Sequence, residues 1–121
     1  MHILVVGCGA IGALYGGKLF QAGHAVSVWS RSNTDMISSD GFDIVSPWGD
    51  FAFKPFHVVS DLNKFDVPVD VVMVTTKVSP NLDVAELIRP VVGPDTDILL
   101  LQNGIDIEPP VVVAFPQHTI L

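Results

Sequence analysis

The sequence predicts an α/β protein: a mostly parallel sheet with helices on both faces and a β-hairpin insertion near residues 42–54. Three observations lead to this fold class. An apolar strand at residues 3–6 runs directly into glycines at positions 7, 9 and 12. Later apolar runs at 67–74 and 98–101 have the length of strands and are bounded by charges or turn residues. Continuous apolar strands of this kind are typical of a parallel sheet that is covered on both faces.

The glycine pattern G-C-G-A-I-G at residues 7–12 predicts a dinucleotide-binding turn. In this pattern Gly7 lets the chain turn off the strand, Gly9 lets a pyrophosphate approach the backbone, and Gly12 lets the next helix pack against the sheet. The N-terminus of that helix offers N–H donors and partial positive charge to phosphates. We therefore expect cofactor contacts from Gly7, Cys8, Gly9, Ala10, Ile11 and Gly12.

The pattern alone has low specificity, and the elements around it supply the context that it requires. Apolar residues recur at helical spacing after the turn, and Gly23 follows them as the expected C-cap. These apolar residues are Ile11, Leu14, Tyr15, Leu19 and Ala22. Residues 25–29 alternate and are rich in valine, which predicts a second strand. Together these elements make a Rossmann-type unit, and a tight turn in another kind of α/β protein is the alternative.

The end of the second strand indicates which dinucleotide is bound. Enzymes that use NAD usually place Asp or Glu there for the ribose 2′-hydroxyl, whereas this chain has S-R-S-N and no acidic residue before Asp35. Arg31 carries a fixed charge and a planar fork of donors that suit a 2′-phosphate. The chain has only six Lys and Arg, which weighs against an ordinary surface arginine. We therefore expect NADP(H).

The middle of the chain predicts the hairpin. Residues 42–45 and 51–53 flank the turn sequence S-P-W-G-D, and residues 57–59 form a further short extended piece. A single helical turn is expected over residues 61–65, with Asp61 as its N-cap.

Two further strands are expected at residues 70–76 and 97–101. The helix between them begins at Ser79-Pro80 and is ended or bent by Pro90. Residues 106–115 are ambiguous, because their valines favour a strand while βα alternation favours a helix, and we expect a short helix. Residues 119–121 are expected to begin another strand.

In open α/β sheets, ligands bind beyond the carboxyl ends of the strands, where the strand order reverses. Lys77 and Asn103 follow two of the expected strands. Lys77 can bond the cofactor's ribose, its phosphates or a substrate anion, although a solvated lysine is the alternative. The Asn103 amide both donates and accepts, so it can orient the nicotinamide ribose or a substrate hydroxyl. An ordinary Asn-Gly turn is the alternative for Asn103.

Composition excludes several other classes. The net charge of −7 and the thinly spread cations argue against nucleic acid or an anionic membrane as partner. No apolar run reaches the ~20 residues that span a bilayer, and no signal peptide is expected. A single cysteine, Cys8, cannot form an internal disulfide, which fits a reducing, cytoplasmic compartment. The four histidines lack metal-ligand spacing, so no metal site is expected.

Four segments together resemble the ketopantoate reductase (2-dehydropantoate 2-reductase) family. They are the glycine turn, S-R-S after the second strand, V-T-T-K at 74–77 and L-Q-N-G at 101–104, and the hairpin is also similar. The resemblance covers essentially the whole chain but only the N-terminal NADP-binding half of the family's fold. We therefore expect residues 1–121 to form one dinucleotide-binding domain, without the family's helical C-terminal substrate domain.

The resemblance implies NADPH-dependent reduction of 2-dehydropantoate to (R)-pantoate, on the route to pantothenate and coenzyme A. It assigns residues 7–12 to the pyrophosphate, Arg31 to the 2′-phosphate, Lys77 to the cofactor and Asn103 to cofactor and substrate. The family's proton-donating lysine lies in the helical domain. No catalytic residue is therefore expected in this chain, which should bind cofactor without turnover. The 2-oxo acid substrate would need the missing domain, and the exposed interdomain face favours a homo-oligomer.

Two alternatives stay open. The chain can be the N-terminal domain of another NADP-dependent hydroxyacid or opine-type dehydrogenase. It can also be a non-catalytic nucleotide-sensing module, although such modules more often carry an acidic residue at the end of the second strand.

Overall fold

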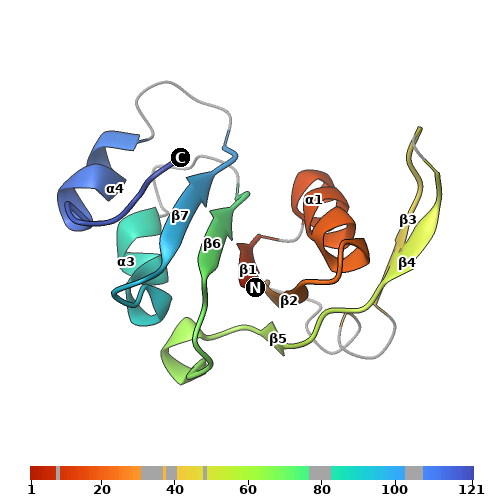
Figure 1. Ribbon diagram of the computed structural model, residues 1–121, viewed down its shortest axis with the longest axis horizontal. Coiled ribbons are helices and arrows are strands. Elements are labelled where there is room, and N and C mark those ends of the chain that lie inside the picture. The colour runs from red at the N-terminus through yellow and green to blue at the C-terminus, as the bar shows by residue number, and fades with distance from the viewer. Residues whose placement is uncertain (8, 31–36, 38–40, 48, 77–82, 103–107) are drawn as a thin grey trace.

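The computed structural model describes residues 1–7, 9–30, 37, 41–47, 49–76, 83–102 and 108–121. Five of its strands form one sheet in the order β5-β2-β1-β6-β7, and every pairing is parallel (Figure 1). These strands are β1 (His2–Val6), β2 (Ala25–Trp29), β5 (Val58–Val59), β6 (Val71–Val74) and β7 (Asp97–Leu100). The chain fills one side of β1 first and then crosses to the other side. The strand order therefore reverses at β1, and the expected Rossmann-type α/β fold class is confirmed.

Side chains of the central strand alternate between two cores, because successive residues of a strand point to opposite faces. Ile3 and Val5 belong to a cluster on the face of α1 (Ala10–Gln21) and the hairpin. Leu4 and Val6 belong to a cluster on the opposite face. All four side chains are at most 3% exposed, so β1 is buried on both sides.

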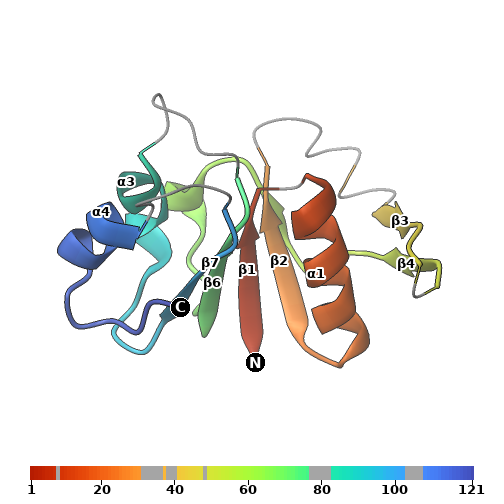
Figure 2. The same cartoon turned by 90° about the horizontal axis from the view of Figure 1, so that it is seen from above.

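The second face is covered by short helices that include α3 (Val84–Ile88) and α4 (Glu108–Ala114), as Figure 2 shows from above. Asp83 caps α3, because its carboxylate accepts from the Glu86 N–H at 3.2 Å. The helix tightens into the 3₁₀ turn η2 (Arg89–Val91) at Pro90, the residue expected to end or bend it. The 3₁₀ turn η1 (Leu62–Lys64) has the expected N-cap, since Asp61 accepts from Asn63 N–H at 3.0 Å.

The helix after the glycine turn is confirmed, and its apolar pattern matches its contact face only in part. Ile11 and Tyr15 are 42% and 50% exposed. Small residues of α1, among them Gly16 and Gly17, are buried instead. A Cβ atom at Gly17 would lie 2.6 Å from the Phe51 ring. Glycines therefore set how closely α1 approaches the sheet and the hairpin, a role that a search for apolar spacing does not detect.

The expected hairpin forms a separate two-stranded antiparallel sheet. Its strands are β3 (Phe42–Ile44) and β4 (Phe51–Phe53), with Phe42 opposite Phe53. Figure 1 shows the hairpin beyond α1, on the side away from β6 and β7. Phe53 is 1% exposed within the α1-side core, so the hairpin is packed into the fold and does not hang from it.

The ambiguous segment near the C-terminus is helical over residues 108–114. Helix α4 begins at Glu108 and places Pro109 and Pro110 in its first turn, where a missing N–H costs no hydrogen bond. Beyond it, Ile120 forms a parallel bridge with Ile98, as expected for the start of another strand. None of the described helices has the length and hydropathy needed to span a membrane.

Candidate functional site

The carboxyl ends of three neighbouring strands meet at the glycine turn. The Gly7 N–H donates to the carbonyl of Trp29 at the end of β2, at 3.0 Å. The Thr75 N–H, just after β6, donates to the carbonyl of Val6 at the end of β1, at 2.9 Å. This edge lies at the top of Figure 2, and it is where the strand order reverses. The fold therefore places the turn where open α/β sheets bind their ligands.

The fold itself requires two of the three glycines in the turn. Gly7 has φ +110°, and a Cβ atom there would lie 2.9 Å from the backbone nitrogen of Thr76. A Cβ atom at Gly12 would overlap the Gly7 carbonyl oxygen and lie 2.6 Å from Thr75 Oγ1. These positions hold the turn against β6 and the helix against the turn, as the sequence pattern predicts.

Gly9 differs from both, because the protein gives no steric reason for its lack of a side chain. Its φ is −76°, which any residue can adopt, and it is exposed. Beyond its chain neighbours, no described atom would lie within 4 Å of a Cβ atom there. A side chain at this point would instead fill the space above the turn, so Gly9 leaves room for a group outside the protein.

The N-terminus of α1 points its donors into the same space. Gly9 is the N-cap and supplies no side-chain hydrogen bond, and the first turn contains no acidic residue. The first N–H groups of a helix have no partners within the helix and carry partial positive charge. Open space next to such donors fits a phosphate or pyrophosphate.

Two residues that the sequence analysis did not single out hold this edge together. The Thr75 hydroxyl donates to the Gly7 carbonyl at 2.7 Å, with a longer contact of 3.3 Å to the Val6 carbonyl. The Gln102 amide nitrogen donates to the Thr76 carbonyl and hydroxyl oxygens, each at 3.0 Å. Both residues lie within the V-T-T-K and L-Q-N-G segments, and a polar side chain directly after a buried strand was the available signal.

Four of the expected cofactor residues, Cys8, Arg31, Lys77 and Asn103, lie outside the described residues. The structure does describe the strand end that leads to Arg31. The backbone N–H of Ser30 donates to the Val59 carbonyl at 3.1 Å, and the Trp29 indole N–H donates to the Ser60 carbonyl at 3.0 Å. These bonds fix the end of β2 against β5, at the same edge as the glycine turn.

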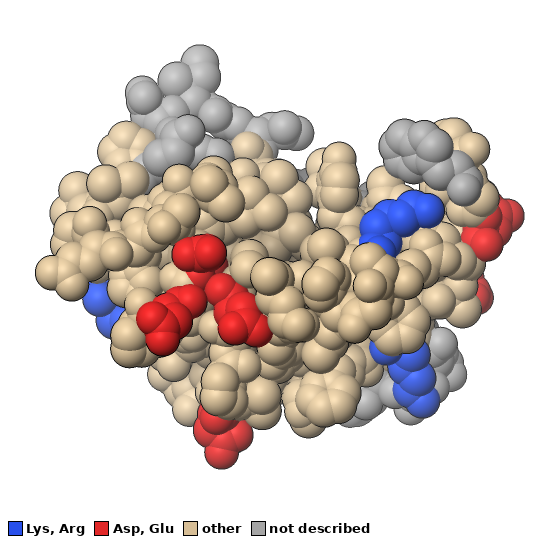
Figure 3. Space-filling model, in the orientation of Figure 1, with Lys and Arg blue, Asp and Glu red and all other residues tan. Residues whose placement is uncertain are grey.

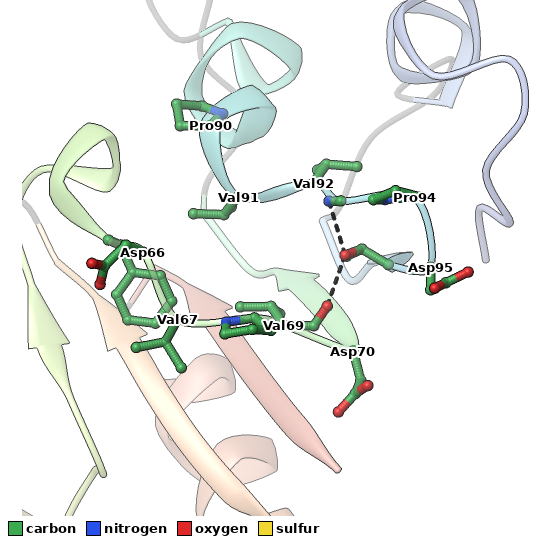
Figure 4. A pocket seen from close by; sticks show the side chains of 13 residues that line it. Asp66, Val67, Val69, Asp70, Pro90, Val91, Val92, Pro94 and Asp95 are labelled. Carbon is green, nitrogen blue, oxygen red and sulfur yellow. Dashed lines mark hydrogen bonds between the residues drawn. The ribbon is translucent and has the colours of Figure 1, made fainter.

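A pocket of about 400 Å³ lies at the opposite edge, near the amino ends of β6 and β7 (Figure 4). Asp66, Asp70 and Asp95 line it. Its buried hydroxyl, that of Thr96, is already paired, since it donates to the Val69 carbonyl and accepts from the Gly93 N–H. Carboxylates repel the phosphates of a dinucleotide, so this pocket does not suit the expected cofactor.

Charge on the described surface is mixed on the face drawn in Figure 3. Acidic side chains gather near its centre, and Lys and Arg side chains lie toward its edges. The described residues contain no group of three or more His, Cys, Asp or Glu that could hold a metal ion. The glycine turn is therefore the place in the described structure whose geometry and electrostatics suit a phosphate-bearing ligand.

Comparison with known proteins finds a family model and relatives that cover most of this chain. The family model described as ketopantoate reductase PanE/ApbA matches residues 3–121. A 2-dehydropantoate 2-reductase from Nostoc sp. is 33% identical over 117 residues, which are 97% of this chain and 36% of that protein. The chain thus spans about a third of that relative's length.

Solved structures give the same answer for the fold. The crystal structure of 2-dehydropantoate 2-reductase from Methylococcus capsulatus has a TM-score of 0.91 and 42% identity, over 99% of this chain and 39% of that one. A ternary structure of D-mandelate dehydrogenase with NADH and anilino(oxo)acetate has a TM-score of 0.82 at 23% identity, over 99% of this chain and 39% of that one, and shows the shared fold alone. Because the family model matches nearly the whole of this chain, the chain belongs to the ketopantoate reductase family of oxidoreductases.

Proposed function

We propose that residues 1–121 form the NADP(H)-binding domain of an enzyme that reduces 2-dehydropantoate to (R)-pantoate by hydride transfer. The observation that supports this most directly is Gly9. It has no neighbour within 4 Å of where a side chain would stand, and it caps a helix whose first turn lacks acidic residues. Family membership is the basis for the proposed reaction. The open space beside the helix N-terminus is the basis for the proposed position of the pyrophosphate.

In this proposal the chain's residues bind and orient the cofactor, and the nicotinamide supplies the hydride. The turn from Gly7 to Gly12, including Cys8, Ala10 and Ile11, holds the pyrophosphate. Arg31 pairs with the 2′-phosphate, because a guanidinium matches phosphate with two parallel hydrogen bonds. Lys77 contacts the cofactor, and Asn103 contacts both the cofactor and the substrate.

The residues of the proposed cofactor site bind the cofactor and are given no catalytic role. None of them is assigned the proton transfer that completes reduction of a ketone to an alcohol, which needs a general acid near the developing alkoxide. The proposed role of the 121 residues is therefore cofactor binding, and catalysis would need further residues of a longer protein.

The proposal is tested by titrating the purified chain with NADPH and following the nicotinamide fluorescence. The wild type should bind in a saturable manner. Gly9→Ala should weaken binding at least about tenfold, because a methyl group would occupy the space of the pyrophosphate. Its thermal unfolding midpoint should stay within about 2 °C of the wild type, because the methyl group would meet no described atom beyond its chain neighbours.

Gly93→Ala is the matched control. A Cβ atom there would lie 3.5 Å from Thr96 Oγ1, an ordinary contact at the opposite edge of the sheet. This variant should bind NADPH like the wild type. If the wild type binds no NADPH, the proposed function is wrong. If Gly9→Ala binds NADPH as tightly as the wild type, the glycine turn is not the cofactor site.

A further inference from the structure

Within the described glycine turn, the Gly7 carbonyl accepts a hydrogen bond from a side chain that directly follows β6. The donor is the Thr75 hydroxyl, at 2.7 Å. Its other contact, to the Val6 carbonyl, is 3.3 Å long, and that carbonyl already accepts the Thr75 N–H at 2.9 Å. Since a hydroxyl has one proton, the shorter bond to Gly7 is the one that the geometry favours.

This bond determines where the carbonyl of the turn points. A Cβ atom at Gly12 would overlap the Gly7 carbonyl oxygen, so this oxygen lies directly beneath the first turn of α1. It is therefore turned into the protein, between the end of β6 and the helix. A carbonyl oxygen carries partial negative charge, and a turn that binds an anion must direct such oxygens inward and N–H groups outward.

We propose that Thr75 is a positioning residue of the dinucleotide site. Its hydroxyl holds the Gly7 carbonyl inward and so keeps the glycine turn in the conformation that accepts a pyrophosphate. The inference rests on the proposed function. It adds a residue that does not touch the cofactor and that acts through the backbone of the turn.

Thr96 provides a matched comparison within the same chain. Its hydroxyl also donates to a backbone carbonyl at 2.7 Å, that of Val69, and it too stands next to the end of a sheet strand. It lies at the amino edge, in the pocket of Figure 4, away from the glycine turn. Removing the Thr96 hydroxyl deletes a donated bond of the same length and also the bond that it accepts from the Gly93 N–H. It should therefore disturb the fold at least as much as removing the Thr75 hydroxyl, without touching the turn.

The test compares Thr75→Val, Thr75→Ala, Thr75→Ser and Thr96→Val. Each variant is measured for NADPH affinity by fluorescence titration and for its thermal unfolding midpoint without ligand. Thr75→Val and Thr75→Ala should weaken NADPH binding about tenfold, the scale of one lost hydrogen bond. Thr75→Ser keeps the hydroxyl and should bind within about threefold of the wild type. Thr96→Val should lower the unfolding midpoint and leave the affinity unchanged.

Four results would overturn the inference. The first is unchanged affinity in both Thr75→Val and Thr75→Ala. The second is a Thr75→Ser variant that binds as weakly as Thr75→Val. The third is an equal loss of affinity in Thr96→Val, which would make the effect one of general stability. The fourth is unfolding of both hydroxyl-free variants at the assay temperature, which would assign Thr75 to folding. A wild type that binds no NADPH would refute the proposed function itself, which separates the two failures.

Discussion

The side-chain amide of Gln102 donates to both oxygens of Thr76, the carbonyl and the hydroxyl, at 3.0 Å each. One residue follows β7 and the other follows β6, so this pair ties together the carboxyl ends of two adjacent strands. In the sequence, Lys77 directly follows Thr76 and Asn103 directly follows Gln102. The pair therefore anchors the starting points of the two segments that carry expected cofactor residues.

Replacing Gln102 by leucine should lower the free energy of unfolding by about 1–2 kcal/mol, because two acceptors of Thr76 lose their donor at a half-buried position. The measurement is urea unfolding followed by circular dichroism. Gln117→Leu is the control, since Gln117 is exposed, and it should change stability by less than about 0.5 kcal/mol. Equal stabilities of the two variants would mean that the Gln102–Thr76 bonds contribute nothing.

Gly12→Ala should destabilise the chain by about 2 kcal/mol or more, because its methyl group would overlap the Gly7 carbonyl oxygen and press on Thr75 Oγ1. Gly9→Ala, three residues earlier in the same turn, should leave stability nearly unchanged. The two variants therefore separate the glycine that the fold needs from the glycine that the ligand needs. Similar unfolding midpoints for both would contradict the steric difference between them.

Gly17→Ala should also be destabilising, by about 1–3 kcal/mol, since a Cβ atom there would lie 2.6 Å from the Phe51 ring of the hairpin. This loss of stability comes from one contact, so it should be smaller in a variant that lacks the Phe51 ring. In a double-mutant cycle with Phe51→Ala, the two effects should fall short of additivity by at least about 0.5 kcal/mol. Additive effects would show that the hairpin does not limit the approach of α1.

The 121-residue chain should bind NADPH but should not reduce 2-dehydropantoate at a measurable rate. The reason is that no residue proposed for the cofactor site supplies the proton that the product alcohol requires. The assay is the decrease in NADPH absorbance after addition of 2-dehydropantoate to the purified chain. Sustained turnover that depends on the chain would refute this division between binding and catalysis.

The sequence predicted much of the fold, because its strong patterns are local. The residues of β1 and β2 are apolar or alternating, which predicts strands. The glycine turn between β1 and α1 identifies the order strand, turn, helix, strand. Apolar spacing predicted the contact face of α1 only in part, since Leu14 and Leu19 pack against the core. Ile11 and Tyr15 are exposed, while glycines approach the sheet, because close backbone approach competes with the burial of large side chains.

The sequence pointed to residues that would touch the ligand. It did not point to the residues that hold those residues in place. Gly7, Gly9 and Gly12 stand in the arrangement that the pattern implies. Thr75 and Gln102 were missed, because a polar residue after a strand does not reveal its partner until the strands are placed side by side. Their hydrogen bonds reach partners 68 and 26 residues away in the sequence, respectively, beyond the reach of any local pattern.

The central claim is that this chain binds NADP(H) through the glycine turn and Arg31. The most direct measurement is the affinity of the wild type, Arg31→Ala and Arg89→Ala for NADPH and NADH, by fluorescence titration. Arg89 is a suitable control, because it pairs with Glu86 at 2.8 Å on the surface near α3. The wild type and Arg89→Ala should bind NADPH at least about tenfold more tightly than NADH, and Arg31→Ala should lose that preference. Equal affinities for the two dinucleotides in the wild type, unchanged by Arg31→Ala, would contradict the account.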